Sequence, residues 1–233
     1  AEAVPSSVPP QGPTDTAFAQ DIGFVSDNFV SHDLNDFPGQ TVVGPNAQPI
    51  FAMDFDETAT TLYAIDNTTR ELGTYNLATG AFNLIAVVSG IPVADNISGM
   101  TIAADGTAYV SGLGVGMTLY TMDLGTAVAT PIGTDAARGL MIDIAINCED
   151  EMFGHDISAD MIYSIDIATG LATPVGPTGV DSNFAQGMDF DNSDGTLYAY
   201  TYQGGGANQY GTINLATDRS EERRVGKECR SRW

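Results

Sequence analysis

The chain has 233 residues, of which 8 are Lys or Arg and 30 are Asp or Glu, giving a formal net charge of −22. This charge argues against binding to a nucleic-acid backbone, because such binding needs Lys and Arg to displace counterions from phosphates. Hydrophobic residues make up 43% of the chain, enough for a folded core, but they form no apolar run long enough to span a bilayer.

The first 21 residues have the composition of a linker. They are rich in Pro, Ala, Ser and Thr, with four prolines in the first thirteen positions, and such segments are extended rather than packed. Ala1-Glu2-Ala3 fits the end of a signal-peptidase site, but no apolar segment precedes it. We expect residues 1–21 to be a linker or the remnant of an N-terminal region, and residues 22–218 to be the folded domain.

A four-residue pattern, Ser/Thr-x-Asp/Asn-Leu/Ile, recurs five times in the folded domain. Successive Asp or Asn positions are 43, 47, 43 and 48 residues apart. The copies are residues 31–34, 74–77, 121–124, 164–167 and 212–215. A repeat of this length is typical of architectures in which each copy is one supersecondary unit.

Each complete repeat contains four short apolar segments separated by turn signals. In the last repeat, Gly187-Met188-Asp189-Phe190 is followed by Leu197-Tyr198-Ala199, with Asp194-Gly195 between them. Asp-Gly favours a tight hairpin because both residues tolerate positive φ. Four short strands in about 45 residues form one blade of a β-propeller. Because no stretch carries a helical apolar period, we predict an all-β fold made of four-stranded propeller blades.

The repeats predict four to five visible blades. The first is represented only by its later strands, around residues 22–44, and the last begins at residue 186 and stops at 218 before its final strand. Three complete blades lie between them, at residues 49–88, 98–133 and 139–176. Natural propellers have about four to eight blades. We therefore expect an incomplete propeller, either an open arc or a strained ring of four to five blades.

The last fifteen residues differ from all the preceding ones. Residues 219–233, RSEERRVGKECRSRW, hold six of the eight basic residues, Cys229 and the only Trp. The string looks like the in-frame translation of a common DNA-sequencing adapter, which would make the chain a metagenomic fragment with a non-native tail. Without this segment, 2 basic and 27 acidic residues remain, a net charge of −25. Of the 27 acids 22 are Asp, the residue that caps turns and strand ends.

The repeats resemble the blades of secreted bacterial β-propeller proteins, which read approximately LYxID…TGxAT-x-VG. The matching residues are Met161-Ile162-Tyr163-Ser164-Ile165-Asp166, Ala168-Thr169-Gly170 and Thr173-Pro174-Val175-Gly176. The resemblance extends over most of residues 29–218 and implies a module of a larger secreted or surface protein. It implies an extracellular or cell-surface location, in keeping with the acidic composition, and further domains in the parent chain.

Four aspartates are the candidate metal ligands. They form two pairs, Asp54 with Asp56 and Asp189 with Asp191. Residues i and i+2 of a strand point to one face, and paired carboxylates bind Ca²⁺ or act as acid and base. Because Thr101 and Ala145 occupy the position of Asp54 in the other blades, we favour a role for these aspartates in holding loops at strand ends. No cofactor other than Ca²⁺ is suggested.

The remaining sequence offers no catalytic set. The two histidines, His32 and His155, lie in different blades without a second ligand at metal-binding spacing. Sialidase propellers need three arginines around their substrate, whereas only Arg70 and Arg138 precede the tail.

We therefore carry three hypotheses. The first is a non-catalytic extracellular module that presents a protein- or glycan-binding surface. The second is a Ca²⁺-dependent propeller hydrolase or lyase using Asp54 and Asp189, and the third is a structural spacer between other domains.

Overall fold

The computed structural model describes residues 16–22, 27–34, 36–45, 48–183, 187–205 and 207–215. These residues belong to two compact units, one containing residues 1–47 with 77–81 and the other residues 48–76 with 82–233. Residues 1–15 of the expected linker and the whole of the tail at 219–233 lie outside the described residues.

The first unit contains one antiparallel sheet in the order β1-β2-β3. Its strands are β1 (Thr16–Ile22), β2 (Asp27–Asp33) and β3 (Asp36–Pro45). Strand β1 begins at Thr16, six residues inside the range that we expected to be linker. The sheet pairs Val30 of β2 with Val42 of β3 and has a bulge beside this pair.

The second unit contains four antiparallel sheets, and in each the strands follow one another in chain order. The first sheet has β4 (Ile50–Phe55), β5 (Leu62–Asp66), β6 (Glu71–Tyr75) and β7 (Phe82–Val87). The second has β8 (Asn96–Ile102), β9 (Ala108–Leu113), β10 (Met117–Asp123) and β11 (Val128–Asp135). The third has β12 (Met141–Ile146), β13 (Met152–Asp156), β14 (Met161–Ile165) and β15 (Ala172–Pro177). The fourth has β16 (Gly187–Asp191), β17 (Thr196–Gly204) and β18 (Ala207–Ile213).

The prediction of an all-β propeller is confirmed. The described residues form five blades, of which three have four strands and the first and last have three, with almost no helix. The three complete blades fall where the repeats place them. The described residues include no helix long and apolar enough to cross a membrane.

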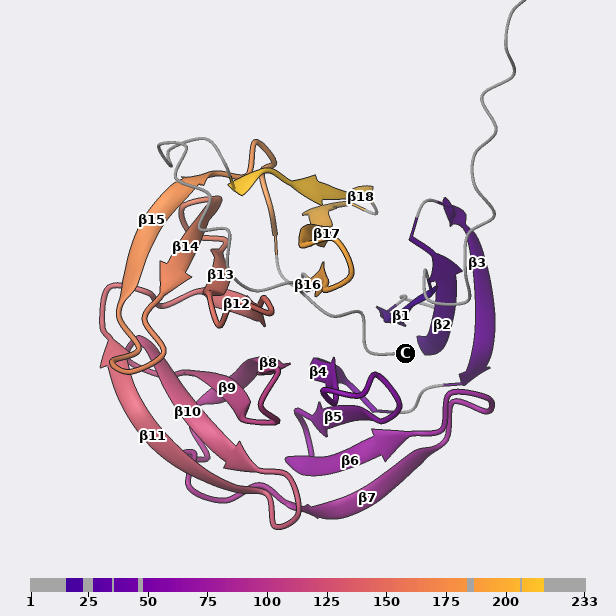
Figure 1. Cartoon of the computed structure of the whole chain (residues 1–233), viewed down its shortest axis with the longest axis horizontal. Coiled ribbons are helices and arrows are strands. Elements are labelled where there is room, and N and C mark those ends of the chain that lie inside the picture. The colour runs from indigo at the N-terminus through magenta and orange to yellow at the C-terminus, as the bar shows by residue number, and fades with distance from the viewer. Residues whose placement is uncertain are drawn as a thin grey trace, which may run out of the picture. The chain divides into compact units, whose positions relative to one another are not determined.

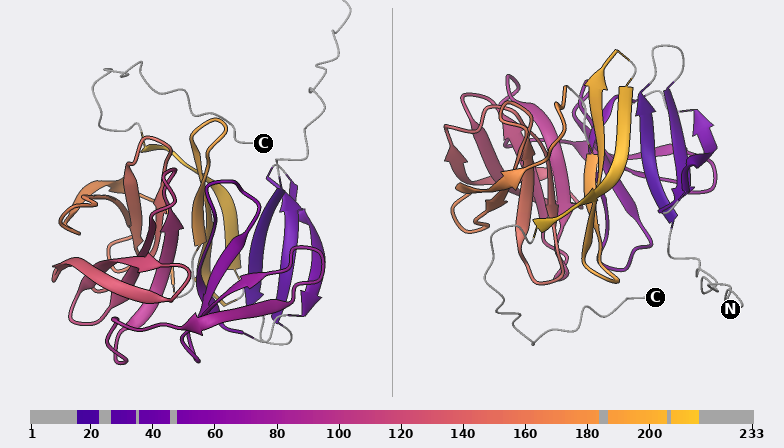
Figure 2. Two further views of the ribbon diagram at one scale, coloured as in Figure 1. Left: turned by 60° about the horizontal axis from the view of Figure 1, so that its bottom comes forward. Right: turned by 90° about the horizontal axis from the view of Figure 1, so that it is seen from above.

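Within the second unit the sheets stand side by side with their first strands innermost. Strand β8 contacts both β4 and β12, and β12 contacts β16, so these four inner strands lie together while β7, β11 and β15 run along the outside (Figure 1). Figure 2 shows the same sheets from two other directions, with β17 and β18 in orange and yellow. Every sheet thus has an inner edge and an outer edge.

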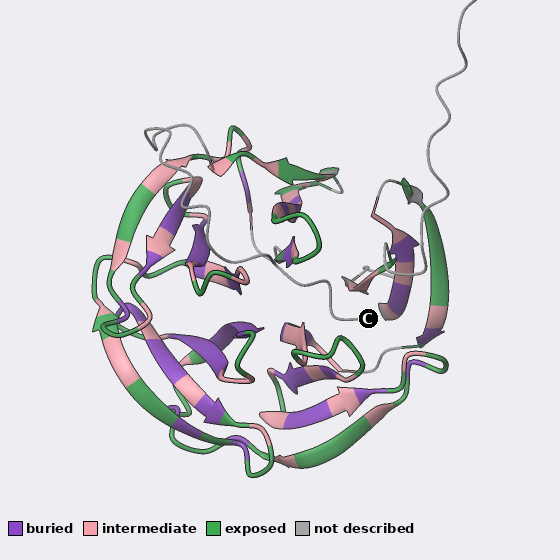
Figure 3. Cartoon of the chain, viewed as in Figure 1, coloured by how far each residue is buried: buried purple, intermediate pink, exposed green. Residues whose placement is uncertain are grey.

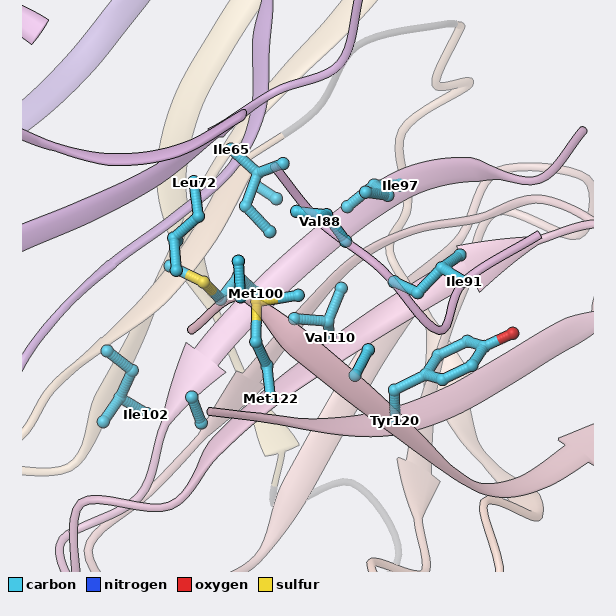
Figure 4. Packing of buried hydrophobic residues seen from close by; sticks show 14 residues of the cluster. Ile65, Leu72, Val88, Ile91, Ile97, Met100, Ile102, Val110, Tyr120 and Met122 are labelled. Atoms are coloured by element: carbon cyan, nitrogen blue, oxygen red, sulfur yellow. The ribbon is translucent and has the colours of Figure 1, made fainter. Parts of the chain in front are cut away.

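Apolar side chains fill the spaces between neighbouring sheets. One cluster joins the β4–β7 and β8–β11 sheets and includes the fully buried Ile65, Leu72 and Val110 (Figure 4). A second cluster, with Met117 and Met141, joins the β8–β11 and β12–β15 sheets, and a third joins the last two sheets. The alternation of apolar and polar residues along short strands supplies a buried face to both neighbours of each blade.

The repeated turn motif and the repeated outer-strand glycine meet in space. Asp166 accepts hydrogen bonds from the backbone N–H groups of Ala168 (2.8 Å) and Thr169 (3.1 Å), and Gly170 has a positive φ of 70°. A Cβ added at Gly133, in the outer strand of the preceding blade, would overlap the backbone carbonyl of Thr169. Gly44 meets the backbone carbonyl of Thr79 in the same way, so the turn motif and the glycine recur together in these two cases.

Candidate functional site

Polar side chains from all four inner strands of the second unit gather at the inner edge. They are Asp54 of β4, Thr101 of β8, Asp143 of β12 and Asp189 of β16. Asp54, Thr101 and Asp189 occupy matching repeat positions, and Ala145 of β12 occupies the fourth. Asp143 lies two residues before Ala145, so the third blade presents its carboxylate from a shifted position. We call these four residues the inner-strand polar set.

Asp54 joins its blade to the next one. Its Oδ2 atom accepts hydrogen bonds from the backbone N–H of Ile102 (2.6 Å) and from the Thr101 hydroxyl (3.1 Å). Its Oδ1 atom accepts from the N–H of Phe55 at 2.6 Å. A carboxylate with three donors from two strands is a structural clamp between the blades.

Thr101 and Asp143 continue the same arrangement around the inner edge. The Thr101 hydroxyl oxygen accepts a hydrogen bond from the N–H of Ile146 at 3.1 Å. Asp143 accepts from the N–H of Met188 at 2.7 Å and from that of Ile144 at 2.9 Å. Strands β4, β8 and β12 therefore each offer a side-chain oxygen to a backbone N–H of the inner strand that follows.

Asp189 differs from the other carboxylates. Its Oδ1 accepts a hydrogen bond from the N–H of the adjacent Phe190 at 2.8 Å, and no bond joins it to another strand among the described residues. The residue is exposed to solvent, but protein atoms also surround its carboxyl group and partly desolvate it. Desolvation by these surroundings, with the Asp191 charge adding to it, raises the pKa of Asp189 to about 6.

Burial raises the pKa of the other two carboxylates as well. Desolvation is the main cause for both Asp54 and Asp143, and the negative charge of Asp189 adds to it in each case. The hydrogen bonds from Ile102, Phe55, Met188 and Ile144 oppose the rise. The negative charge of Asp189 thus couples its titration to those of Asp54 and Asp143.

Asp56 and Asp191, the outer members of the two predicted pairs, hold turns. Asp56 accepts hydrogen bonds from the N–H groups of Thr60 (2.9 Å) and Thr61 (3.1 Å) in the β4–β5 turn. Slight burial raises its pKa, but these bonds and one from the Thr58 hydroxyl outweigh it, so the pKa is lowered. Asp191 accepts from the N–H of Ser193 at 2.8 Å. Asp56 and Asp191 thus hold loops, the role that we favoured from the sequence. Asp54 instead joins its blade to the next one.

The described residues include no group of three or more His, Cys, Asp or Glu side chains that could hold a metal ion. The weak calcium candidates Asp54, Asp56, Asp189 and Asp191 thus divide between the inner edge and two separate turns.

Both histidines are buried. The ring Nδ1 of His32 lies 2.7 Å from the carbonyl oxygen of Asp33. His155 is 1% exposed, and its Nε2 has no hydrogen-bond partner within the part of the chain that the structure describes. Desolvation lowers the pKa of His155, although the carboxylates of Asp160 and Asp156 act in the opposite direction. In the register of β12 and β13, His155 pairs with Asp143.

The two arginines before the tail are used within the fold. Arg70 donates to the carbonyl oxygens of Asp95 (2.9 Å) and Ile91 (3.1 Å). Arg138 donates to the Tyr163 hydroxyl at 2.5 Å and lies 3.7 Å from Asp156. Neither guanidinium belongs to the inner-strand polar set.

The sequence predicted two of the four residues in this set. Asp143 was missed because alignment of the repeats without gaps puts Ala145, and not Asp143, at the position of Asp54. Thr101 was taken as a break in the pattern. A carboxylate displaced by two residues stays on the same strand face. An Asp within two residues of the expected position is the signal that would have found it.

A family model described as a repeat of unknown function, DUF6923, matches residues 41–227. The chain belongs to this family. The match includes four of the five described blades and extends nine residues into the segment 219–233. No curated protein matches this DUF6923 chain significantly.

Solved structures similar to the DUF6923 chain share little sequence identity with it. A protein of unknown function from Bacteroides thetaiotaomicron VPI-5482 has a TM-score of 0.57 and 14% identity over 85% of this chain and 57% of its own. A chain of a nidogen/laminin complex has a TM-score of 0.56 and 14% identity over 84% and 76%. A putative gluconolactonase has a TM-score of 0.53 and 12% identity over 80% and 71%. The chain thus spans little more than half of the Bacteroides protein, and these similarities establish the fold alone.

Proposed function

We propose that the DUF6923 chain is a non-catalytic propeller module of a secreted or surface-exposed bacterial protein, with a rigid surface that binds a protein or a glycan. The observation that carries this proposal is the use of the inner-strand polar set within the fold. Asp54 and Asp143 bond to the backbone of the next blade, which leaves them poorly placed to serve a substrate. An acidic chain with few basic residues is soluble in an extracellular setting.

A fold neighbour supports the binding role by analogy. One similar chain was solved within a nidogen/laminin complex, so this architecture serves as a protein-binding module in at least one other protein. The proposal is tested by probing an array of glycans and an array of purified extracellular proteins with the labelled chain. Saturable binding that survives EDTA is expected. Absence of binding on both arrays contradicts the proposal.

The second candidate is a Ca²⁺-dependent hydrolase or lyase with its site at the inner edge. Asp189 favours it, because this exposed carboxylate has no bond to another strand among the described residues and a raised pKa. Isothermal titration with Ca²⁺ separates the two candidates. Binding that is lost in Asp189→Asn and kept in Asp191→Asn would support the enzyme. If no heat of Ca²⁺ binding is measured, the enzyme is excluded and the non-catalytic module stands. A chain that also binds nothing on either array would be the third candidate, a structural spacer.

We also propose that residues 219–233 are foreign to the natural protein. The abrupt change in charge supports this, since the segment holds six of the eight basic residues. The test compares the thermal unfolding of chains that end at residues 218 and 233. Both chains carry Cys148→Ser, because deletion of residues 219–233 removes Cys229, the only other cysteine, and would otherwise change the cysteine chemistry as well. Equal melting temperatures are expected, and a lower value for the shorter chain would contradict the proposal.

A further inference from the structure

The outer strands of the complete blades leave one row of backbone groups unpaired by their own sheet. Strands β7, β11 and β15 each pair with one neighbour within the sheet, and Figure 3 shows exposed residues along all three. An exposed strand edge can pair with an extended segment of another chain. Proteins commonly block such edges with Pro or with charged side chains.

Two of the three edges carry a proline at one matching position. Pro131 of β11 pairs with Tyr120, and Pro174 of β15 pairs with Tyr163, each beside a bulge of the same kind. Because Pro has no N–H, the ladder to the inner neighbour does not need a donor there. Any residue other than Pro at this position therefore points its backbone N–H toward the free edge.

Strand β7 has Leu84 at this position. Leu84 pairs with Gly73, and the bulge beside this pair matches those beside Pro131 and Pro174. The edge of β7 therefore keeps a backbone N–H that the sister blades lack. In the first unit, Val42 holds the corresponding position in β3, which provides an internal comparison.

Apolar side chains are also exposed on β7. Leu84 is 56% exposed, Ile85 37% and Val87 59%. Val128 at the start of β11 is 47% exposed and lies beside the end of this strand, because its backbone pairs with Ser89. In contrast, β15 has no large exposed hydrophobic residue. We call Leu84, Ile85, Val87 and Val128 the β7 edge patch.

Charge decides between a second copy and a different partner. Two copies, each with a formal net charge of −22, would repel one another when their edges pair. An extended segment with Lys or Arg would be attracted instead. Glu71 pairs directly with Val87, which places an acidic residue one strand from the patch.

We propose that the free edge of β7 binds an extended segment of a partner protein in which apolar and basic residues alternate. The segment adds a fifth strand to the blade through backbone hydrogen bonds, and its apolar side chains cover the β7 edge patch. This inference rests on the proposed binding role and specifies the surface and the chemistry of the partner.

The test uses a fluorescein-labelled decapeptide of alternating Val and Lys, with fluorescence anisotropy in 150 mM salt as the readout. Two control peptides are an analogue with N-methylated valines, which cannot complete the ladder, and an alternating Val/Glu peptide. The full chain should bind the first peptide saturably and neither control. The Leu84→Pro variant should bind at least about tenfold more weakly, because it loses an edge donor and an apolar contact.

A matched variant makes the result specific. Val42→Pro should bind like the parent chain, because Val42 is the only exposed large hydrophobic residue among those described in β3, whereas β7 has three. If Leu84→Pro unfolds, the double variant Ile85→Lys/Val87→Lys, which places charges on the edge without altering the backbone, replaces it. Unchanged affinity in the folded edge variant, loss in Val42→Pro instead, or no saturable binding by the parent chain overturns the proposal. Array binding that Leu84→Pro leaves intact would overturn the β7 assignment while the proposed binding role stands.

Discussion

Asp54 of β4 accepts a hydrogen bond from the backbone N–H of Ile102 in β8 at 2.6 Å, which links the inner strands of two consecutive blades. The Thr101 hydroxyl donates to the same oxygen. Ile102 is 7% exposed, so its N–H has little access to water if the carboxylate is removed. Asp54 therefore has a structural function, although the pair that it forms with Asp56 in the sequence resembles a catalytic pattern.

Asp54→Ala should therefore destabilise the chain by about 1–3 kcal/mol, the usual cost of leaving a buried donor without a partner. Asp54→Asn should lose less than about 1 kcal/mol, because its amide oxygen can still accept one of the bonds. The free energy of unfolding in urea measures both. The matched control is Asp56→Ala, which removes only contacts in an exposed turn. Equal stability of Asp54→Ala and Asp56→Ala would contradict the clamp.

The architecture was predictable because each repeated motif has a local physical cause. Asp166 caps its own turn, and Gly133 makes room for that turn in the next blade, so both recur at a fixed spacing. The inner-strand polar set was only partly predictable. Asp143 reaches Met188, 45 residues away, from a position that the repeat register does not mark, and such a contact is set by the packing of two blades. The raised pKa of Asp189 likewise depends on neighbours from other strands.

The carboxylates of the inner edge should make stability fall as pH rises through the mildly acidic range. A folded-state pKa of about 6 for Asp189, above its usual value of 3.8, means that the folded chain binds more protons than the unfolded chain between these values. The stabilisation is full below about pH 4 and is lost as pH rises toward 6. Asp54 and Asp143 act in the same direction.

Asp189→Asn should consequently gain stability relative to the parent chain between pH 4 and pH 7, by less than about 1 kcal/mol because solvent screens an exposed charge. Its effect should also appear as a lower pKa of Asp54 in a carboxyl NMR titration, since the Asp189 charge raises that pKa. Asp56→Asn is the control of opposite sign, because the pKa of Asp56 is lowered and its replacement loses relative stability as pH rises. A pH-independent effect of Asp189→Asn would refute the coupling.

Gly99 should tolerate no side chain. A Cβ at this position would lie 2.7 Å from Oδ1 of Asp143 and 2.8 Å from the backbone nitrogen of Ile144, so β8 and β12 would have to move apart. Gly99→Ala should cost about 1–3 kcal/mol, as overpacking usually does. Gly139→Ala is the matched control, because a Cβ there meets nothing within 4 Å. Thermal unfolding compares the two, and equal melting temperatures would show that the inner strands are loosely packed.

His155 should make the chain sensitive to acid. The pKa of this buried imidazole is lowered by desolvation below its usual value of 6.5, so the unfolded chain takes up a proton more readily than the folded chain. The stability that the neutral ring allows is present above about pH 6.5 and is lost as pH falls through the folded-state pKa. This direction is opposite to that of the inner-edge carboxylates.

The corresponding position in the first complete blade indicates the replacement. Ile65 pairs with Ala52 there as His155 pairs with Asp143, and Ile65 is fully buried in the first apolar cluster. His155→Ile removes a ring nitrogen that has no partner among the described residues, so it should stabilise the chain by about 1–3 kcal/mol. The gain should be larger at pH 5 than at pH 8 in urea unfolding. The reverse variant Ile65→His should lose stability, more at pH 5 than at pH 8. If His155→Ile were instead less stable than the parent chain at pH 5, the imidazole would have to be charged and hydrogen-bonded in the folded protein.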